Sequence, residues 1–241
     1  MTVIIVLVIG FGLGVILYSY FSSDKIVIRK KLKKAELKKI SSFKNGEFGK
    51  VIGNVRFVDK PLTAPFSNRK CAFYDVEVEH KKSNGKNSYW DTIISERKHV
   101  SYLIKQDEHY AFINHKSLIC YLVKDKNYSS GFGNDAEKHL EKFLNRHNAQ
   151  SEGFFGMNRT LRYNEGILEE NEEVAIFGEG NWKEASELGL PVSYGKVLEI
   201  SAPVDDKVYL TDDVVVSIKQ ATKNHNVRRK SNRHEHRYLK K

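Results

Sequence analysis

An apolar run at the N-terminus constrains this chain more than any other feature. Residues 2–21 read TVIIVLVIGFGLGVILYSYF, and Asp24 is the first charged side chain after them. A run of about twenty apolar residues forms a helix long enough to cross a hydrocarbon core of roughly 30 Å. The rest of the chain is polar enough to be soluble, with 29% charged residues overall. The sequence therefore predicts a transmembrane anchor at residues 1–21 and a globular part held beside the membrane.

A cleaved signal peptide is the alternative interpretation of this run. Such a peptide begins with positively charged residues and ends with small residues at its cleavage site. Here Thr2 leads directly into the apolar run, and Tyr18, Tyr20 and Phe21 occupy its end. We favour an uncleaved anchor, in which these aromatic residues form a belt at the membrane interface.

Basic residues follow the apolar run and set its expected orientation. An excess of Lys and Arg beside a span marks its cytoplasmic side, so we expect the globular part to be cytoplasmic. Basic residues close to an anionic bilayer contribute about 1 kcal/mol each to binding. A lipid-contacting set is therefore predicted at Lys25, Arg29, Lys30, Lys31, Lys33 and Lys34.

Composition divides the remaining chain into three segments. Residues 22–44 indicate a basic juxtamembrane helix or linker, with apolar residues at near-helical spacing over 24–43 and Asp24 as the N-cap. Residues 45–218 form a β-rich globular domain. Residues 219–241 are basic and almost free of apolar residues, which is typical of a disordered tail.

Short strand-like segments dominate the globular domain. In one of them Tyr74, Val76 and Val78 alternate with acidic residues, so one face is apolar and the other charged. The turn at 83–87 predicts a hairpin. Further strands are predicted at 49–58, 109–114, 116–123, 172–180, 195–201, 208–211 and 214–220. Many short strands separated by turns favour a largely antiparallel barrel or sandwich.

One internal helix is predicted between residues 134 and 149. Asn134 and Glu137 have the spacing of a capping box, and Leu140 and Phe143 recur on one face. The flanking segments 128–133 and 150–156 indicate loops. The domain is therefore α+β, formed either as one body or as two small β lobes separated by this helix.

Motifs of catalytic sites do not occur in the sequence. It contains no GxSxG, GxxxxGK[ST] or HExxH pattern. His225, His234 and His236 have a spacing that suits metal ligands, but a polar terminal segment lacks the rigid set of four ligands that a closed site needs. We therefore predict no catalytic residue, no metal and no cofactor.

The basic tail admits three interpretations. It can contact anionic lipid, bind nucleic acid through phosphates, or remain a solvated terminus. The sequence has no RNP-type aromatic platform and no helix-turn-helix pattern, so nucleic acid ranks below the other two.

The two cysteines, Cys71 and Cys120, lie among apolar residues. Such surroundings are typical of buried free thiols. A disulfide between them is the alternative if the domain faces an oxidising compartment.

Residues 45–213 resemble the GIDE domain, which is also called BAM for "beside a membrane". The likeness lies in a Gly-containing strand, two prolines in the following loop, a Cys and a Tyr before a charged strand, and the later motif LRYNEGILEENEEVAIFGEG. The residues that carry it are Gly53, Pro61, Pro65, Cys71, Tyr74, Trp90, Tyr163, Glu165 and Gly178.

The resemblance implies structural roles for these residues. It implies tight packing or turns at the glycines, a shaped loop at the prolines, and core positions for Cys71, Tyr74 and Trp90. Arg162 and Glu165 are the polar members of the later motif, and we expect a buried or surface ion pair there, with a binding face as the alternative.

The resemblance also implies a function. Known relatives include E3 ubiquitin ligases of the MULAN type, which carry a C-terminal RING. A RING needs eight zinc ligands, mostly cysteines, and no cysteine follows Cys120. We therefore expect a RING-less member of prokaryotic type, acting as a non-catalytic protein-interaction or scaffold module at the membrane surface. Activity as a ubiquitin ligase is the alternative.

Overall fold

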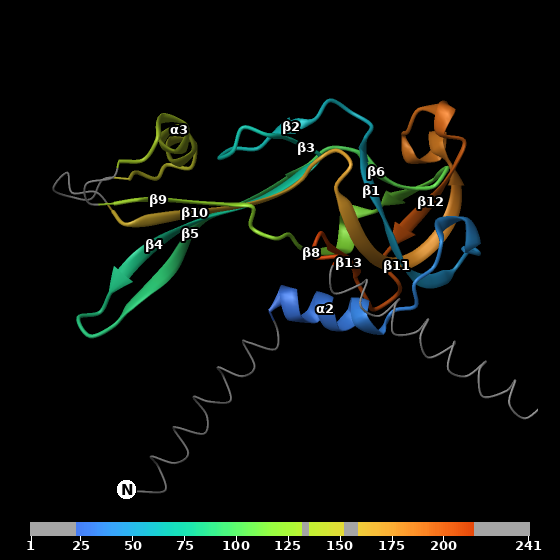
Figure 1. The fold of residues 1–241 in the computed structure, drawn as a ribbon, viewed down its shortest axis with the longest axis horizontal. Helices are drawn as coiled ribbons and strands as arrows, with labels where there is room; N and C mark the ends of the chain where they lie inside the picture. Colours follow the sequence, from blue (N-terminus) through green and yellow to red (C-terminus); the bar gives the residue numbers. More distant parts are fainter. Residues whose placement is uncertain (1–22, 132–134, 152–158, 215–241) are drawn as a thin grey trace, which may run out of the picture. The chain divides into compact units, whose positions relative to one another are not determined.

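The computed structural model describes residues 23–131, 135–151 and 159–214. The predicted anchor, Asn134 and the basic tail lie outside these residues. The chain divides into two compact units (Figure 1). The first comprises residues up to 53, residues 106–121 and the chain from 173 onward, and the second comprises 54–105 and 122–172. The prediction of two lobes separated by the internal helix is wrong, because the chain passes between the units repeatedly and that helix lies inside the second unit.

Five strands, most of them in the first unit, close into a barrel. Strands β1, β6, β7, β12 and β11 follow one another in the sheet, and β11 pairs back to β1, which closes the barrel. Strands β13 and β8 extend the sheet beyond β11, and β1 and β6 continue into the second unit. The elements are α2 (Asp24–Lys34), η1 (Ile40–Ser42), β1 (Glu47–Phe57), β6 (Tyr102–Gln106), β7 (His109–Ile113), η2 (His115–Ser117), β8 (Leu118–Tyr121), β11 (Glu173–Glu184), η3 (Ala185–Leu188), η4 (Val192–Tyr194), β12 (Lys196–Ser201) and β13 (Val208–Thr211).

The predicted β-rich barrel of largely antiparallel strands is confirmed, with two exceptions. Strand β12 runs parallel to β7, and β13 runs parallel to β8. Close packing of β11 depends on glycine. A Cβ atom at Gly178 would lie 2.6 Å from Cγ2 of Ile200, and one at Gly180 would lie 2.6 Å from Cδ1 of Phe43. The tight packing predicted for Gly178 is confirmed, and Gly53 is buried within β1.

Helix α2 is shorter than the sequence predicted. It ends at Lys34 instead of 43, and Ser23 occupies the N-cap position in place of Asp24. The reason is a competing backbone pairing: the N–H of Lys50 donates to the carbonyl of Glu36, and the N–H of Lys38 donates to the carbonyl of Lys50. The chain after the helix therefore lies extended along β1.

The helix is also part of the folded unit and not a linker before it. Ile28 and Leu32 are 0% and 1% exposed and pack in a cluster with Ala175 and Tyr209. The folded part consequently begins near Asp24, and the predicted boundary at residue 45 is wrong.

The second unit contains a four-stranded antiparallel sheet in the order β5-β4-β10-β9. Its elements are β2 (Leu62–Thr63), β3 (Lys70–Cys71), β4 (Phe73–Ser83), β5 (Ser88–His99), β9 (Lys126–Ser130), α3 (Lys138–Arg146) and β10 (Leu161–Leu168). The predicted hairpin is confirmed between β4 and β5, with Gly85 at φ +89° in its turn. Tyr74, Val76 and Val78 lie in the core with Tyr163 and the buried face of α3, as the alternation predicted.

Two boundaries in this unit differ from the prediction. Residues 128–130 belong to β9 and not to a loop, because Tyr128 pairs with Tyr163 in β10 and packs against the core. Helix α3 begins at Lys138, with Glu137 at its N-cap position, and ends at Arg146. In the described ranges no helix combines the length and apolarity needed to cross a membrane.

Candidate functional site

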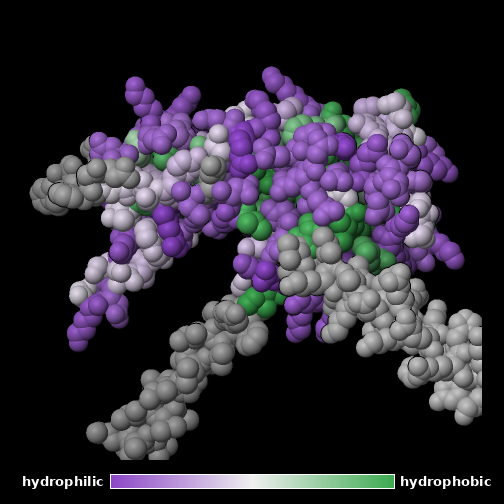
Figure 2. All heavy atoms as spheres, viewed as in Figure 1, coloured by the Kyte–Doolittle hydropathy of each residue, from purple (hydrophilic) through white to green (hydrophobic). Residues whose placement is uncertain are grey.

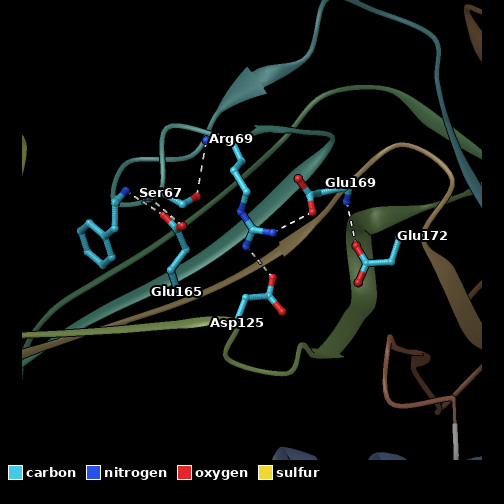
Figure 3. A network of polar contacts seen from close by, with 7 residues as sticks. Ser67, Arg69, Asp125, Glu165, Glu169 and Glu172 are labelled. Carbon is cyan, nitrogen blue, oxygen red and sulfur yellow. Dashed lines mark hydrogen bonds and ion pairs between the residues drawn. The ribbon is translucent and has the colours of Figure 1, made fainter.

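The carboxylate of Glu165 holds a turn of the second unit in place (Figure 3). Glu165 lies in β10 and is 0% exposed. Its two oxygens accept hydrogen bonds from the backbone N–H groups of Phe66 at 2.7 Å and Ser67 at 3.0 Å. The turn is closed by the N–H of Asn68, which donates to the carbonyl of Ala64. The side chain therefore acts as an internal cap for two N–H groups that the turn points inward.

Arg69 extends this network on its more exposed side. Its guanidinium donates to Glu169 at 2.7 Å and to Asp125 at 3.0 Å. Glu172 in turn accepts the N–H of Glu169 at 2.8 Å. Every carboxylate of the network thus has a donor, and Pro65 lies in the capped turn.

A second cluster joins the end of α3 to the sheet. The Tyr74 hydroxyl donates to Glu96, and Nε2 of His147 lies 3.0 Å from the other oxygen of Glu96. Burial, together with the bond to Glu96, raises the pKa of Tyr74 well above its usual range. Although burial alone raises the pKa of Glu96, hydrogen bonds from Tyr74 and Lys98 leave it lowered. A tyrosine held protonated beside an ionised glutamate is a poor nucleophile, so this cluster holds the end of α3 to the sheet.

Cys71 is a core residue, as predicted. It is 0% exposed, and burial raises the pKa of its thiol to about 12. Because the thiolate is the reactive form of cysteine, this residue is chemically inert at neutral pH. Both cysteines are free and buried.

The opposite face of the sheet is polar, and one prediction about it is wrong. Trp90 is half-buried and not a core residue, because its ring lies under the Arg162 guanidinium at 4.3 Å. Arg162 pairs with Glu79 through both carboxylate oxygens, not with Glu165. Side chains three positions apart on a strand point to opposite faces, which separates Arg162 from Glu165. The Arg162 hydrogen bonds also lower the pKa of Glu79.

Three of the six residues predicted to contact lipid instead dock helix α2 on its own unit. Arg29 pairs with Asp213 at 2.6 Å. Lys31 pairs with Asp206, and its ammonium lies over the Phe177 and Tyr209 rings at 5.1 and 5.4 Å. The remaining docking contact is Lys25 over the Tyr121 ring at 4.8 Å.

Lys30, Lys33 and Lys34 form the other half of the set, and all three are exposed. Within the described residues none of them has an ion-pair partner. Figure 2 colours the described residues by hydropathy. The structure therefore separates a docking group (Lys25, Arg29 and Lys31) from an outward group (Lys30, Lys33 and Lys34).

Several residues that make these contacts could not be identified from the sequence. Glu96 and His147 meet only because α3 returns to the sheet, 51 positions along the chain. Lys50 is 2% exposed and donates to the carbonyl of Leu32 at 3.0 Å, which caps the end of α2. Its place within an apolar strand was the one available hint.

No family model, curated protein or solved structure matches this chain. The likeness to GIDE/BAM domains therefore stays a prediction. Among the described residues there is no group of His, Cys, Asp and Glu side chains that could hold a metal ion. The histidines of the tail lie outside the part of the chain that the structure covers.

Proposed function

We propose that this chain is a single-pass, membrane-anchored and non-catalytic interaction module, with the first unit held at the bilayer surface. The observation that carries this proposal is the junction between the apolar run and the fold. The run ends at Phe21, and the docked helix α2 begins at Asp24.

The length of the junction limits how far the folded unit can lie from the membrane. Three residues span at most about 11 Å even when fully extended. The polar layer on each side of a bilayer is roughly 5–8 Å thick. The start of α2 is therefore at the level of the lipid headgroups, or just beyond them, when the run spans the membrane.

The polar clusters of the second unit support a role without catalysis. Glu165, Arg69 and Glu96 cap or tether backbone and side chains, and Cys71 is inert. These groups stabilise the fold and leave no activated nucleophile beside a free base in the described residues.

The second unit offers a surface for a protein partner. Strand β5 is an edge strand of 12 residues, and Tyr89 on it is 51% exposed. Edge strands accept an added strand from another chain. Trp90 and Arg162 on the adjoining face supply the aromatic and Arg side chains that are enriched in interfaces.

Membrane extraction and crosslinking test the two parts of this proposal. We expect the full chain to resist alkaline carbonate extraction and a chain without residues 2–21 to be released. Release of the full chain would refute the anchor. A photo-crosslinking residue at Tyr89 should give a defined protein adduct in cells, and one at Val192, which is 79% exposed in the first unit, should not. Equal patterns at both positions would refute a partner site on β5.

Orientation needs a separate measurement. A cysteine introduced at His225, within the tail, should be protected from a membrane-impermeant thiol reagent in intact cells if the domain is cytoplasmic. Labelling would reverse the orientation predicted from charge. No specific observation favours the ubiquitin-ligase alternative, and we expect the chain not to discharge a charged conjugating enzyme.

A further inference from the structure

We propose that the first unit binds anionic lipid through a defined surface, in which the apolar tip at Val204 inserts into the bilayer beside the outward lysines Lys30, Lys33 and Lys34. This inference rests on the proposed membrane anchor and names the lipid class and the residues that contact it.

The tip is an exposed apolar residue on a fixed loop. Val204 is 91% exposed in the turn between β12 and β13, and Pro203 precedes it. The next residue, Asp205, has φ +65°. Packing within the protein does not explain an apolar residue at this loop tip, since Val204 contacts almost nothing.

The loop is fastened to α2. Asp206, two residues after the tip, pairs with Lys31 in the last turn of the helix. Asp206 also accepts the Tyr209 hydroxyl at 2.6 Å. Since α2 packs on β8, β13 and β11, the loop and the helix form one surface of the first unit (Figure 1). Val204 is therefore held beside α2 and does not need to be ordered upon binding.

Both ends of the described chain reach this same helix. The apolar run ends just before α2, and Asp213, which Arg29 binds, is two residues before the chain leaves the described part. Asp24 and Asp213, which are close to the first and last described residues, therefore lie at the same helix.

Charge is segregated along the chain in agreement with this arrangement. Helix α2 has six basic residues and one acidic residue, and residues 215–241 have nine basic residues and one acidic residue. The whole chain carries +10, so the residues between these two segments are net acidic by three charges. Basic charge gathered around an apolar tip is the combination that binds anionic interfaces. A bilayer is the favoured occupant because the anchor ends at this surface.

The test uses the full chain reconstituted in vesicles of phosphatidylcholine alone or with phosphatidylglycerol. Val204→Cys carries an environment-sensitive fluorophore, and Cys71 and Cys120 are buried and stay unlabelled. Val192→Cys is the matched control, an exposed valine in η4 of the same unit. We expect a blue shift of emission and quenching by lipid-borne quenchers at position 204 in anionic vesicles only, and neither effect at position 192.

A charge variant separates this surface from the anchor. Lys30→Glu, Lys33→Glu and Lys34→Glu together should abolish the quenching at 204, while the protein still resists alkaline extraction. Emission at 204 as water-exposed as at 192 in both vesicles would overturn the inference. So would a probe that shifts only after a membrane protein extract is added, because that result assigns the tip to a protein partner. Failure of the anchor itself would instead appear as extraction of the full chain.

Discussion

Removing the Glu165 carboxylate should destabilise the second unit more than any other single polar substitution in it. Glu165→Ala leaves the N–H groups of Phe66 and Ser67 without acceptors inside the protein. An unsatisfied buried donor costs about 1–3 kcal/mol. Phe66 is 1% exposed and bears the whole penalty, whereas the Ser67 N–H is partly accessible to water. We therefore expect a loss of roughly 2–4 kcal/mol in unfolding free energy.

The two tryptophans allow this loss to be localised. Trp90 lies in the second unit and Trp182 in the first. Urea unfolding of the detergent-solubilised chain, followed in Trp182→Phe and Trp90→Phe backgrounds, reports on each unit separately. The midpoint seen by Trp90 should fall in Glu165→Ala. The matched control is Glu169→Ala, which removes an ion pair whose glutamate side chain is 40% exposed and should cost less than about 1 kcal/mol. Equal losses in the two variants would refute the capping role.

Three further predictions concern burial. Leu32→Ala should lower the unfolding free energy reported by Trp182 by about 2–5 kcal/mol, since it opens a cavity under α2; an unchanged midpoint would mean that the helix is not docked. Burial lowers the pKa of Lys50, so its destabilising effect is absent above the unfolded pKa of about 10.4 and grows as pH falls below it. Lys50→Met should therefore gain stability relative to the parent between pH 11 and pH 8, measured by the Trp182 midpoint, and a constant difference would contradict this. The raised pKa of Cys71, about 12, predicts negligible alkylation at pH 8 by mass spectrometry until denaturant is added; rapid alkylation of the native chain would show an exposed thiolate.

The strands could be predicted because their apolar periodicity is local. Val76 and Val78 alternate with acidic residues, and the hairpin after them contains Gly85 at a positive φ. The ends of α2 could not be predicted in the same way. The pairing of Lys50 with Glu36 competes with the helix, and this pairing joins segments that contact each other only in the folded barrel.

The candidate site shows the same division. The six basic residues were predicted as one set, yet the helical period alone separates them in part. With 100° between residues, Lys30 and Lys34 lie opposite the face of Ile28 and Leu32. What the period cannot supply is the identity of the partners, because Asp206 and Asp213 come from the far end of the chain. The partner of Arg162 could not be predicted for the same reason, since its pairing with Glu79 depends on the register between β10 and β4.

Arg29 and Lys31 dock helix α2 on its own unit. We propose two further tasks for the same helix: the number of its basic residues orients the anchor, and Lys30, Lys33 and Lys34 face the lipid. Charge reversal in the docking group should therefore disturb the fold, because it leaves Asp206 or Asp213 without a partner. Charge reversal in the outward group leaves those pairs intact and should disturb lipid contact alone. The difference between the two groups follows from their angle around the helix, not from their charge.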